Sequence, residues 1–85
     1  ETTMKNEITV KASSVLEARP LAELVALAGK YKSSIRITMD DRMVNAKSIM
    51  GIMGLGLDTG KQIVLEAEGD DAKEAVEAME EFLTT

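Results

Sequence analysis

The fold is decided by a stretch in the middle of the chain, which reads Ser34-Ile35-Arg36-Ile37-Thr38-Met39-Asp40-Asp41-Arg42-Met43-Val44-Asn45-Ala46-Lys47-Ser48-Ile49-Met50-Gly51-Ile52-Met53-Gly54-Leu55. Its first residues, 34–39, alternate apolar and polar side chains, and this period of two predicts a strand. Asp40-Asp41 has the composition of a tight turn, and Met43-Val44-Asn45 predicts a second, short strand. The segment 48–55 predicts a short apolar helix opened by a serine cap, although its glycines lower the intrinsic propensity.

Further out, the same patterns predict two more strands and two longer helices. Residues 7–12 and 62–68 also alternate. After Arg19-Pro20, apolar residues at helical spacing predict a helix that ends at Gly29, and the last helix begins after Gly69. The residues expected on the buried faces of these helices are Leu21, Leu24, Val25 and Ala28, then Ala72, Ala75, Val76, Met79 and either Phe82 or Leu83.

The order of elements is therefore β-α-β-β-α-β-α, which predicts an α+β fold. Helices laid on one face of a mainly antiparallel sheet make a two-layer sandwich. The 85 residues suit a single domain, residues 1–85. Only Tyr31 and Phe82 are aromatic, so we expect an aliphatic core in which the six methionines serve as adaptable filler.

Composition excludes several classes of function. The net charge of −5 argues against direct binding of nucleic acid, whose phosphate backbone requires a basic face. The sequence has no cysteine, which excludes thiolate sites, and no histidine, which excludes a histidine base, a histidine metal ligand and a phosphohistidine. No apolar run approaches the roughly 20 residues of a membrane span. We expect a cytoplasmic protein with no cofactor, metal or catalytic site of its own.

Two segments carry more chemical information. In the segment 16–20, at the start of the first predicted helix, Arg19 brings a fork of donors to a helix N-terminus that favours anions. In the segment 45–53, the hydroxyl of Ser48 stands at another helix start, with Lys47 beside it and apolar residues after it. Both segments combine a place for an anion with a cationic side chain.

These segments resemble two motifs of HPr, the phosphocarrier of the bacterial phosphotransferase system, and the resemblance extends from about Met4 to Leu83. HPr proteins carry Gly-Leu/Ile-His-Ala-Arg-Pro at the start of the first helix, where this chain has Val15-Leu16-Glu17-Ala18-Arg19-Pro20. The regulatory segment of Gram-positive members is close to Val-Asn-Ala-Lys-Ser-Ile-Met-Gly, and here it is Val44-Asn45-Ala46-Lys47-Ser48-Ile49-Met50-Gly51. The resemblance implies an open-faced β-sandwich, with four antiparallel strands covered on one face by three helices.

The chain departs from this family at Glu17, which stands where the family has its phosphorylated histidine. In the family that imidazole takes phosphate from enzyme I and passes it to the sugar permeases, while the arginine matched here by Arg19 helps to hold the phosphate. We expect no relay through Glu17, because the transfer partners are shaped around an imidazole. Two interpretations stay open: Glu17 is a fixed negative charge that partly imitates a phosphohistidine, or it is a solvated loop residue.

The resemblance also implies that Ser48 is the serine modified by the HPr kinase/phosphorylase. A phosphate there adds about −1.5 to −2 charges at a helix N-terminus, which alters charge rather than fold. The alternative is that Ser48 only caps the helix, a contribution of about 1 kcal/mol. The family's partner-binding face implies a matching set of residues in this chain, namely Arg19, Lys47, Ile49, Met50 and Met53.

The leading hypothesis is a regulatory protein similar to the histidine-less catabolite-repression HPr-like proteins (Crh), although those carry glutamine where this chain has Glu17. Its expected partners are the HPr kinase/phosphorylase, the catabolite control regulator or another protein target, and enzyme I without phosphotransfer. Two alternatives remain: a phosphocarrier whose histidine has been substituted, and a docking domain of a larger protein. Val15, where relay proteins usually have glycine, weighs against a single engineered change.

Overall fold

The alternating segments of the sequence pair into one antiparallel sheet, and the helical segments pack on it. The structure is a computed structural model, in which residues 2–11, 18–57 and 59–84 are described. Along the chain the elements are β1 (Thr3–Thr9), α1 (Ala18–Ala28), β2 (Ser34–Met39), β3 (Arg42–Asn45), α2 (Ile49–Leu55), β4 (Gln62–Glu68) and α3 (Ala72–Thr84). The predicted order of elements and the α+β class are confirmed.

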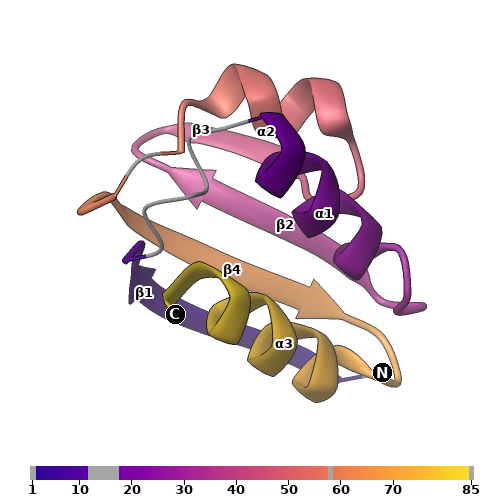
Figure 1. Cartoon of the computed structure of the whole chain (residues 1–85). Helices are drawn as coiled ribbons and strands as arrows, with labels where there is room; N and C mark the ends of the chain where they lie inside the picture. The colour runs from indigo at the N-terminus through magenta and orange to yellow at the C-terminus, as the bar shows by residue number, and fades with distance from the viewer. Residues whose placement is uncertain (1, 12–17, 58, 85) are drawn as a thin grey trace.

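The sheet has the strand order β1-β4-β2-β3, and every neighbouring pair is antiparallel (Figure 1). β1 and β3 are therefore its two edges. The register places Glu66 of β4 between Lys5 of β1 and Arg36 of β2. Arg36 Nε lies 3.4 Å from Glu66 Oε1. Charges of alternating sign thus cross the face of the sheet that carries no helix.

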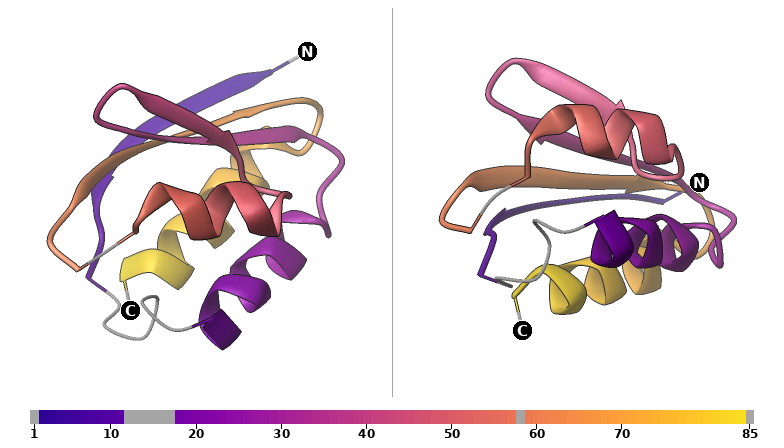
Figure 2. Two further views of the ribbon diagram at one scale, coloured as in Figure 1. Left: turned by 90° about the horizontal axis from the view of Figure 1, so that it is seen from above. Right: turned by 45° about the horizontal axis from the view of Figure 1, so that its top comes forward.

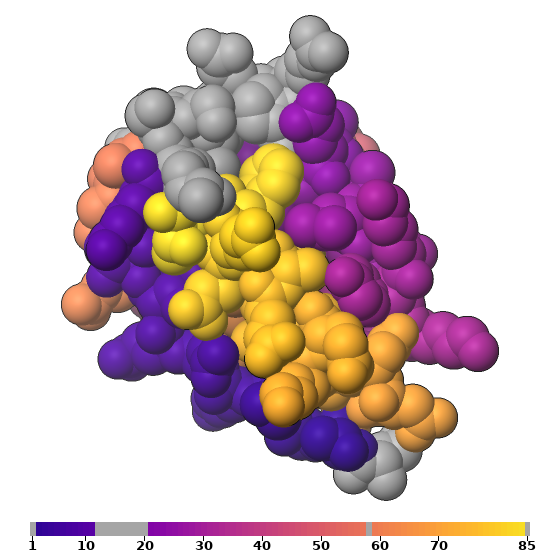
Figure 3. Space-filling model, turned by 60° about the horizontal axis from the view of Figure 1, so that its bottom comes forward, coloured from indigo at the N-terminus to yellow at the C-terminus, as the bar shows by residue number. Residues whose placement is uncertain are grey.

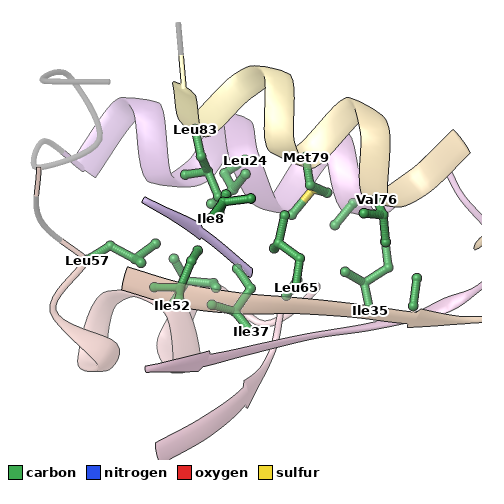
Figure 4. Packing of buried hydrophobic residues seen from close by; sticks show 14 of the residues in the cluster. Ile8, Leu24, Ile35, Ile37, Ile52, Leu57, Leu65, Val76, Met79 and Leu83 are labelled. Atoms are coloured by element: carbon green, nitrogen blue, oxygen red, sulfur yellow. The ribbon is translucent and has the colours of Figure 1, made fainter. Parts of the chain in front are cut away.

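The opposite face of the sheet carries the core. α1 and α3 run side by side along it, while α2 lies beside β3 and α1 (Figures 1 and 2). Every second strand residue meets the helices there (Figure 4), and the buried strand residues are Ile8, Ile35, Ile37, Met39, Ile63, Leu65 and Ala67. The helices contribute Leu21, Leu24, Ala28, Ile52, Leu55, Ala72, Ala75, Val76, Met79 and Leu83. Leu83, rather than Phe82, is the last buried residue of α3, and the predicted Val25 is only half-buried.

The first strand departs most from its predicted bounds. It was expected over residues 7–12 and spans Thr3–Thr9, because its pairing with β4 continues back to the end of that strand. The polar Asn6 hides this pattern, since it faces inward like its apolar neighbours. Its Nδ2 donates to Oε1 of Glu80 on α3 at 3.1 Å. Ala12, expected to face the core, lies outside the described residues.

Candidate functional site

The segment 45–48 forms a tight turn that leads into α2. The main-chain N–H of Ser48 donates to the carbonyl of Asn45 at 3.0 Å, and that of Lys47 donates to Oδ1 of Asn45 at 2.8 Å. Ser48 has an extended backbone, with φ −106° and ψ 113°, and its Oγ accepts from the N–H of Gly51 at 3.2 Å. The predicted N-cap is confirmed, and it holds a half-buried hydroxyl at the start of α2.

Glycines let α2 pack closely and end sharply. A Cβ atom at Gly51 would lie 3.3 Å from Cβ of Val44 on β3, which is closer than two carbon atoms prefer. The helix ends at Gly56, whose φ of 79° is in the left-handed region that favours glycine. Ile52 and Leu55 are buried in the core. Packing therefore stabilises a short helix that intrinsic propensity alone would leave marginal.

Lys47 ties this turn to the connection between α1 and β2. Its Nζ donates to the main-chain carbonyl of Tyr31 at 2.8 Å, and the side chain is half-buried. The sequence predicts Lys47 as a partner-binding cation, whereas the structure shows that its ammonium group already binds a carbonyl oxygen. A partner or a phosphate that draws on this charge competes with Tyr31 for it.

Asp71, which directly precedes α3, holds the same connection from the other side. Its carboxylate accepts from the N–H of Lys32 at 2.8 Å, from the N–H of Ser33 at 2.9 Å and from Oγ of Ser33 at 2.5 Å. The hydroxyl of Ser33, then the amide of Lys32, hold the pKa of Asp71 below its ordinary value. Ser33 is a buried polar residue. The local sequence around Ser33 does not predict this burial, because its partner Asp71 is distant in the sequence.

The exposed apolar side chains gather on β3 and α2. Met50 is 79% exposed and Met53 is 53% exposed, while Ile49 is half-buried against the core. We call Ile49, Met50 and Met53 the α2 surface. Met43, on β3, is 62% exposed, and sequence reasoning did not include it among the partner-binding residues. It faces the side of the sheet without helices, opposite Thr38, so it does not extend the α2 surface directly.

The start of α1 is only partly described. Arg19 lies in the first turn of α1, but its side chain, like the whole of Glu17, lies outside the described residues. α1 packs against α2, so the two predicted segments belong to neighbouring helices (Figure 2). The expected joint action of Arg19 with the α2 surface stays a prediction.

The described part of the chain, residues 2–11, 18–57 and 59–84, holds no group of three or more acidic side chains arranged to bind a metal ion. Within the same residues, no helix has the length and apolarity to cross a membrane.

Known proteins resemble this chain over nearly its whole length. The profile of a family described as "PTS HPr component phosphorylation site" matches residues 4–85. The HPr-like protein Crh of Halalkalibacterium halodurans is 42% identical over 80 residues, covering 94% of this chain and 95% of that protein. The phosphocarrier protein HPr of Lysinibacillus sphaericus is 42% identical over 69 residues, covering 81% and 78%. The crystal structure of a phosphocarrier protein HPr from Bacillus anthracis superposes with a TM-score of 0.92 at 40% identity, covering 98% of this chain and 99% of that one.

Proposed function

Since this chain belongs to the HPr family of the phosphotransferase system, we propose that it is a regulatory member that acts through phosphorylation of Ser48. It carries no phosphate on a histidine, because the sequence contains none. The observation that carries the proposal is that the chain retains the family's serine segment while glutamate replaces the relay histidine.

The relay side of the proposal rests on the chemistry of one side chain. A phosphohistidine is a phosphoramidate, formed at a ring nitrogen, and Glu17 offers only carboxylate oxygens. Its fixed negative charge has the sign of a phosphorylated histidine but neither its size nor its additional acceptor oxygens. Enzyme I is therefore a binding partner in this proposal and not a phosphate donor.

The regulatory side rests on the geometry around Ser48. Ser48 is half-buried, its hydroxyl accepts from the Gly51 amide at 3.2 Å, and the exposed Met50 follows two residues later in α2. A phosphoryl group there adds about −1.5 to −2 charges beside an apolar surface. Such a change discriminates between partners, since it strengthens binding to a cationic site and weakens binding to an apolar one.

The partners of this proposal are proteins. The HPr kinase/phosphorylase modifies Ser48, and the catabolite control regulator or a metabolic enzyme then binds the modified form through the α2 surface. Exposed methionines suit a surface that meets several partners, because their side chains are flexible and polarizable. We place the protein in the cytoplasm, where these partners act, without direct contact to nucleic acid or membrane.

Incubation with purified HPr kinase and ATP, followed by intact mass and site mapping, tests the regulatory role. We expect one phosphate, on Ser48, which the Ser48→Ala variant does not accept. Ser34→Ala is the matched control, because Ser34 is an exposed hydroxyl on β2 and its loss should leave the modification unchanged. An unmodified protein under conditions that modify an ordinary HPr would contradict the proposal.

A further inference from the structure

A hollow of about 330 Å³ lies over β2 and β3, on the face of the sheet that carries no helix. Polar, cationic and apolar side chains line it, among them those of Ser34, Arg36, Met43, Asn45 and Lys47. On the other side of the molecule, α1 and α3 lie against each other and cover the sheet (Figure 3). The hollow is therefore on the exposed surface of the sheet, away from the core.

The register of the strands brings a cation and an amide together in this hollow. Arg36 of β2 lies directly opposite Asn45 of β3. The main-chain N–H of Ala46 donates to the carbonyl of Ile35 at 2.9 Å. Hydrogen-bonded and non-hydrogen-bonded pairs alternate along an antiparallel ladder, so Arg36 and Asn45 form a non-hydrogen-bonded pair, the kind whose side chains lie closer together. Both side chains can reach the same small ligand.

The hydrogen-bond donors of the hollow are suited to an anion. Oδ1 of Asn45 accepts from the main-chain N–H of Lys47 at 2.8 Å, and this bond leaves Nδ2 as the free end of the amide. Within residues 2–11, 18–57 and 59–84, Nδ2 of Asn45 and Oγ of Ser34 have no hydrogen-bond partner. Free donors beside a guanidinium group are complementary to the oxygens of a carboxylate or a phosphate.

The two cations of the hollow differ in how firmly they are held. Nζ of Lys47 is bound to the carbonyl of Tyr31 at 2.8 Å. Arg36 Nε lies 3.4 Å from Glu66 Oε1, and Nη2 lies 4.0 Å from Glu68 Oε1. Both separations are longer than the about 2.7–2.9 Å of a charge-assisted hydrogen bond, so the guanidinium group keeps N–H donors for a ligand. Of the described residues, those that line the hollow include no Asp or Glu.

One available cation favours a ligand with one negative charge. A guanidinium group balances one carboxylate, whereas a phosphate monoester carries about −1.5 to −2 charges at neutral pH. The nearby carboxylates of Glu66 and Glu68 repel the larger charge more strongly. Met43 is exposed on the same face and gives the hollow an apolar wall. A carboxylate with a short carbon chain matches these three properties.

We infer that this hollow is a binding site for a small aliphatic carboxylate. The carboxylate oxygens accept hydrogen bonds from Arg36, Asn45 and Ser34, and the carbon chain lies along the side chain of Met43. A few hydrogen bonds on an open surface bind weakly, with a dissociation constant of about one millimolar. The site uses neither Ser48 nor the α2 surface, so it is independent of the proposed phosphorylation.

An NMR titration of the isotope-labelled full chain with hexanoate tests this site. We expect saturable shifts of the side-chain N–H resonances of Arg36 and Asn45, together with the main-chain amides of residues 34–36 and 43–47. Hexanamide has the same carbon chain without the charge, and acetate has the charge without the chain, so each should bind about tenfold more weakly. Saturable shifts centred elsewhere, the absence of saturation, or equal binding of hexanamide overturns the inference.

A matched pair of variants separates the site from general effects of charge. Arg36 and Lys5 lie on the two sides of Glu66 in the sheet, but the hollow is lined by Arg36. Arg36→Gln should weaken hexanoate binding by about tenfold or more, whereas Lys5→Gln makes the same change in charge and should alter binding less than about twofold. Thermal unfolding verifies that both variants are folded. Equal weakening by the two variants overturns the inference.

Three further variants test the hollow without removing Arg36. Asn45→Asp keeps an oxygen for the Lys47 amide and replaces the free donor by a negatively charged oxygen, so it should weaken binding by more than about tenfold. Glu66→Gln removes a charge that competes for Arg36 and should tighten binding severalfold. Met43→Ala should weaken binding of hexanoate severalfold and leave that of acetate unchanged. Weaker binding by Glu66→Gln, or unchanged binding by Asn45→Asp, overturns the inference.

Discussion

The two segments that this chain shares with its family differ in what they retain. The segment 44–51 keeps its serine, its lysine and its apolar residues, and the structure shows them in an ordered turn and helix cap. The segment 15–20 keeps Arg19-Pro20, but in the proposed alignment it has Glu17 in place of the relay histidine and Val15 in place of the usual glycine. If the proposed function holds, the difference teaches that one scaffold can lose its phosphate acceptor in the segment before α1 and still keep the serine segment before α2.

The largest expected effect comes from placing a histidine at position 17, in the segment 15–20. We expect Glu17→His to accept one phosphate from enzyme I and phosphoenolpyruvate where the wild-type chain accepts none, because Arg19 and Pro20 still lie in the first turn of α1. Intact mass measures the gain. If Glu17→His accepts no phosphate but the double variant Val15→Gly/Glu17→His does, Val15 also prevents phosphate transfer. If neither variant accepts phosphate, the prediction is contradicted.

Truncating a side chain to alanine should affect the free energy of unfolding very differently on the two faces of α2. Ile52 is fully buried, so Ile52→Ala is expected to lower the free energy of unfolding by about 2–5 kcal/mol. Met50 is 79% exposed, so Met50→Ala should change that free energy by no more than about 0.5 kcal/mol, while it weakens binding of the protein partner. Chemical denaturation and a binding titration measure the two effects. Equal losses of stability would contradict the assignment of faces.

The cap and the phosphate acceptor at Ser48 can be separated. Ser48→Ala removes the acceptor of the Gly51 amide and should cost about 1 kcal/mol, whereas Ser48→Asp keeps a capping oxygen and should leave stability nearly unchanged. For a domain of this size, 1 kcal/mol corresponds to a fall in Tm of about 4–8 °C. Thermal unfolding of both variants checks this. A Ser48→Asp variant as unstable as Ser48→Ala would argue against the cap.

The helical glycines of α2 offer a smaller contrast. At Gly54 an added Cβ meets no atom within 4 Å, whereas at Gly51 it lies 3.3 Å from Val44 Cβ. Gly54→Ala should therefore stabilise the chain by up to about 1 kcal/mol, from helix propensity and a restricted unfolded chain. Gly51→Ala should gain less or lose stability, because β3 must yield. Denaturant midpoints rank the two, and the reverse order would show that α2 does not pack on β3 as described.

The smallest expected effect concerns the Asp71 contacts that support the regulatory side. The folded pKa of Asp71 is lowered, so its contribution to stability is present above the unfolded pKa of about 3.9 and is lost as pH falls through the lower, folded value. Asp71→Asn should flatten this part of the pH dependence. Unfolding measured from neutral to acidic pH, with Asp70→Asn as control, tests the claim. Equal slopes for wild type and Asp71→Asn would contradict it.

Most of the fold could be predicted from the sequence, because its strands and helices follow simple periods. β2 and β4 have the predicted bounds, and Ser48 caps α2 as its residue type indicates. β1 was placed too late because Asn6, a polar residue, faces inward and is satisfied by Glu80. That partner is 74 residues away in the sequence, and no local pattern reports it.

The site was predicted less completely, for the same physical reason. The exposure of Met50 and Met53 agrees with the predicted surface, but Ile49 is half-buried. The contacts of Lys47 with Tyr31 and of Asp71 with Ser33 join residues that are 16 and 38 positions apart. Periodicity and composition predict which side chains face the core and which face solvent. Contacts between segments distant in the sequence can be seen only in the folded structure.

The most direct test of the central claim offers both phosphate donors to the same preparation of wild-type protein. One portion receives enzyme I and phosphoenolpyruvate, another receives HPr kinase and ATP, and both are analysed by intact mass and site mapping, with an ordinary HPr as positive control. The proposal predicts no phosphate from enzyme I and a single phosphate on Ser48 from the kinase. Phosphate on Glu17, or a Ser48 that the kinase leaves unmodified, would contradict it.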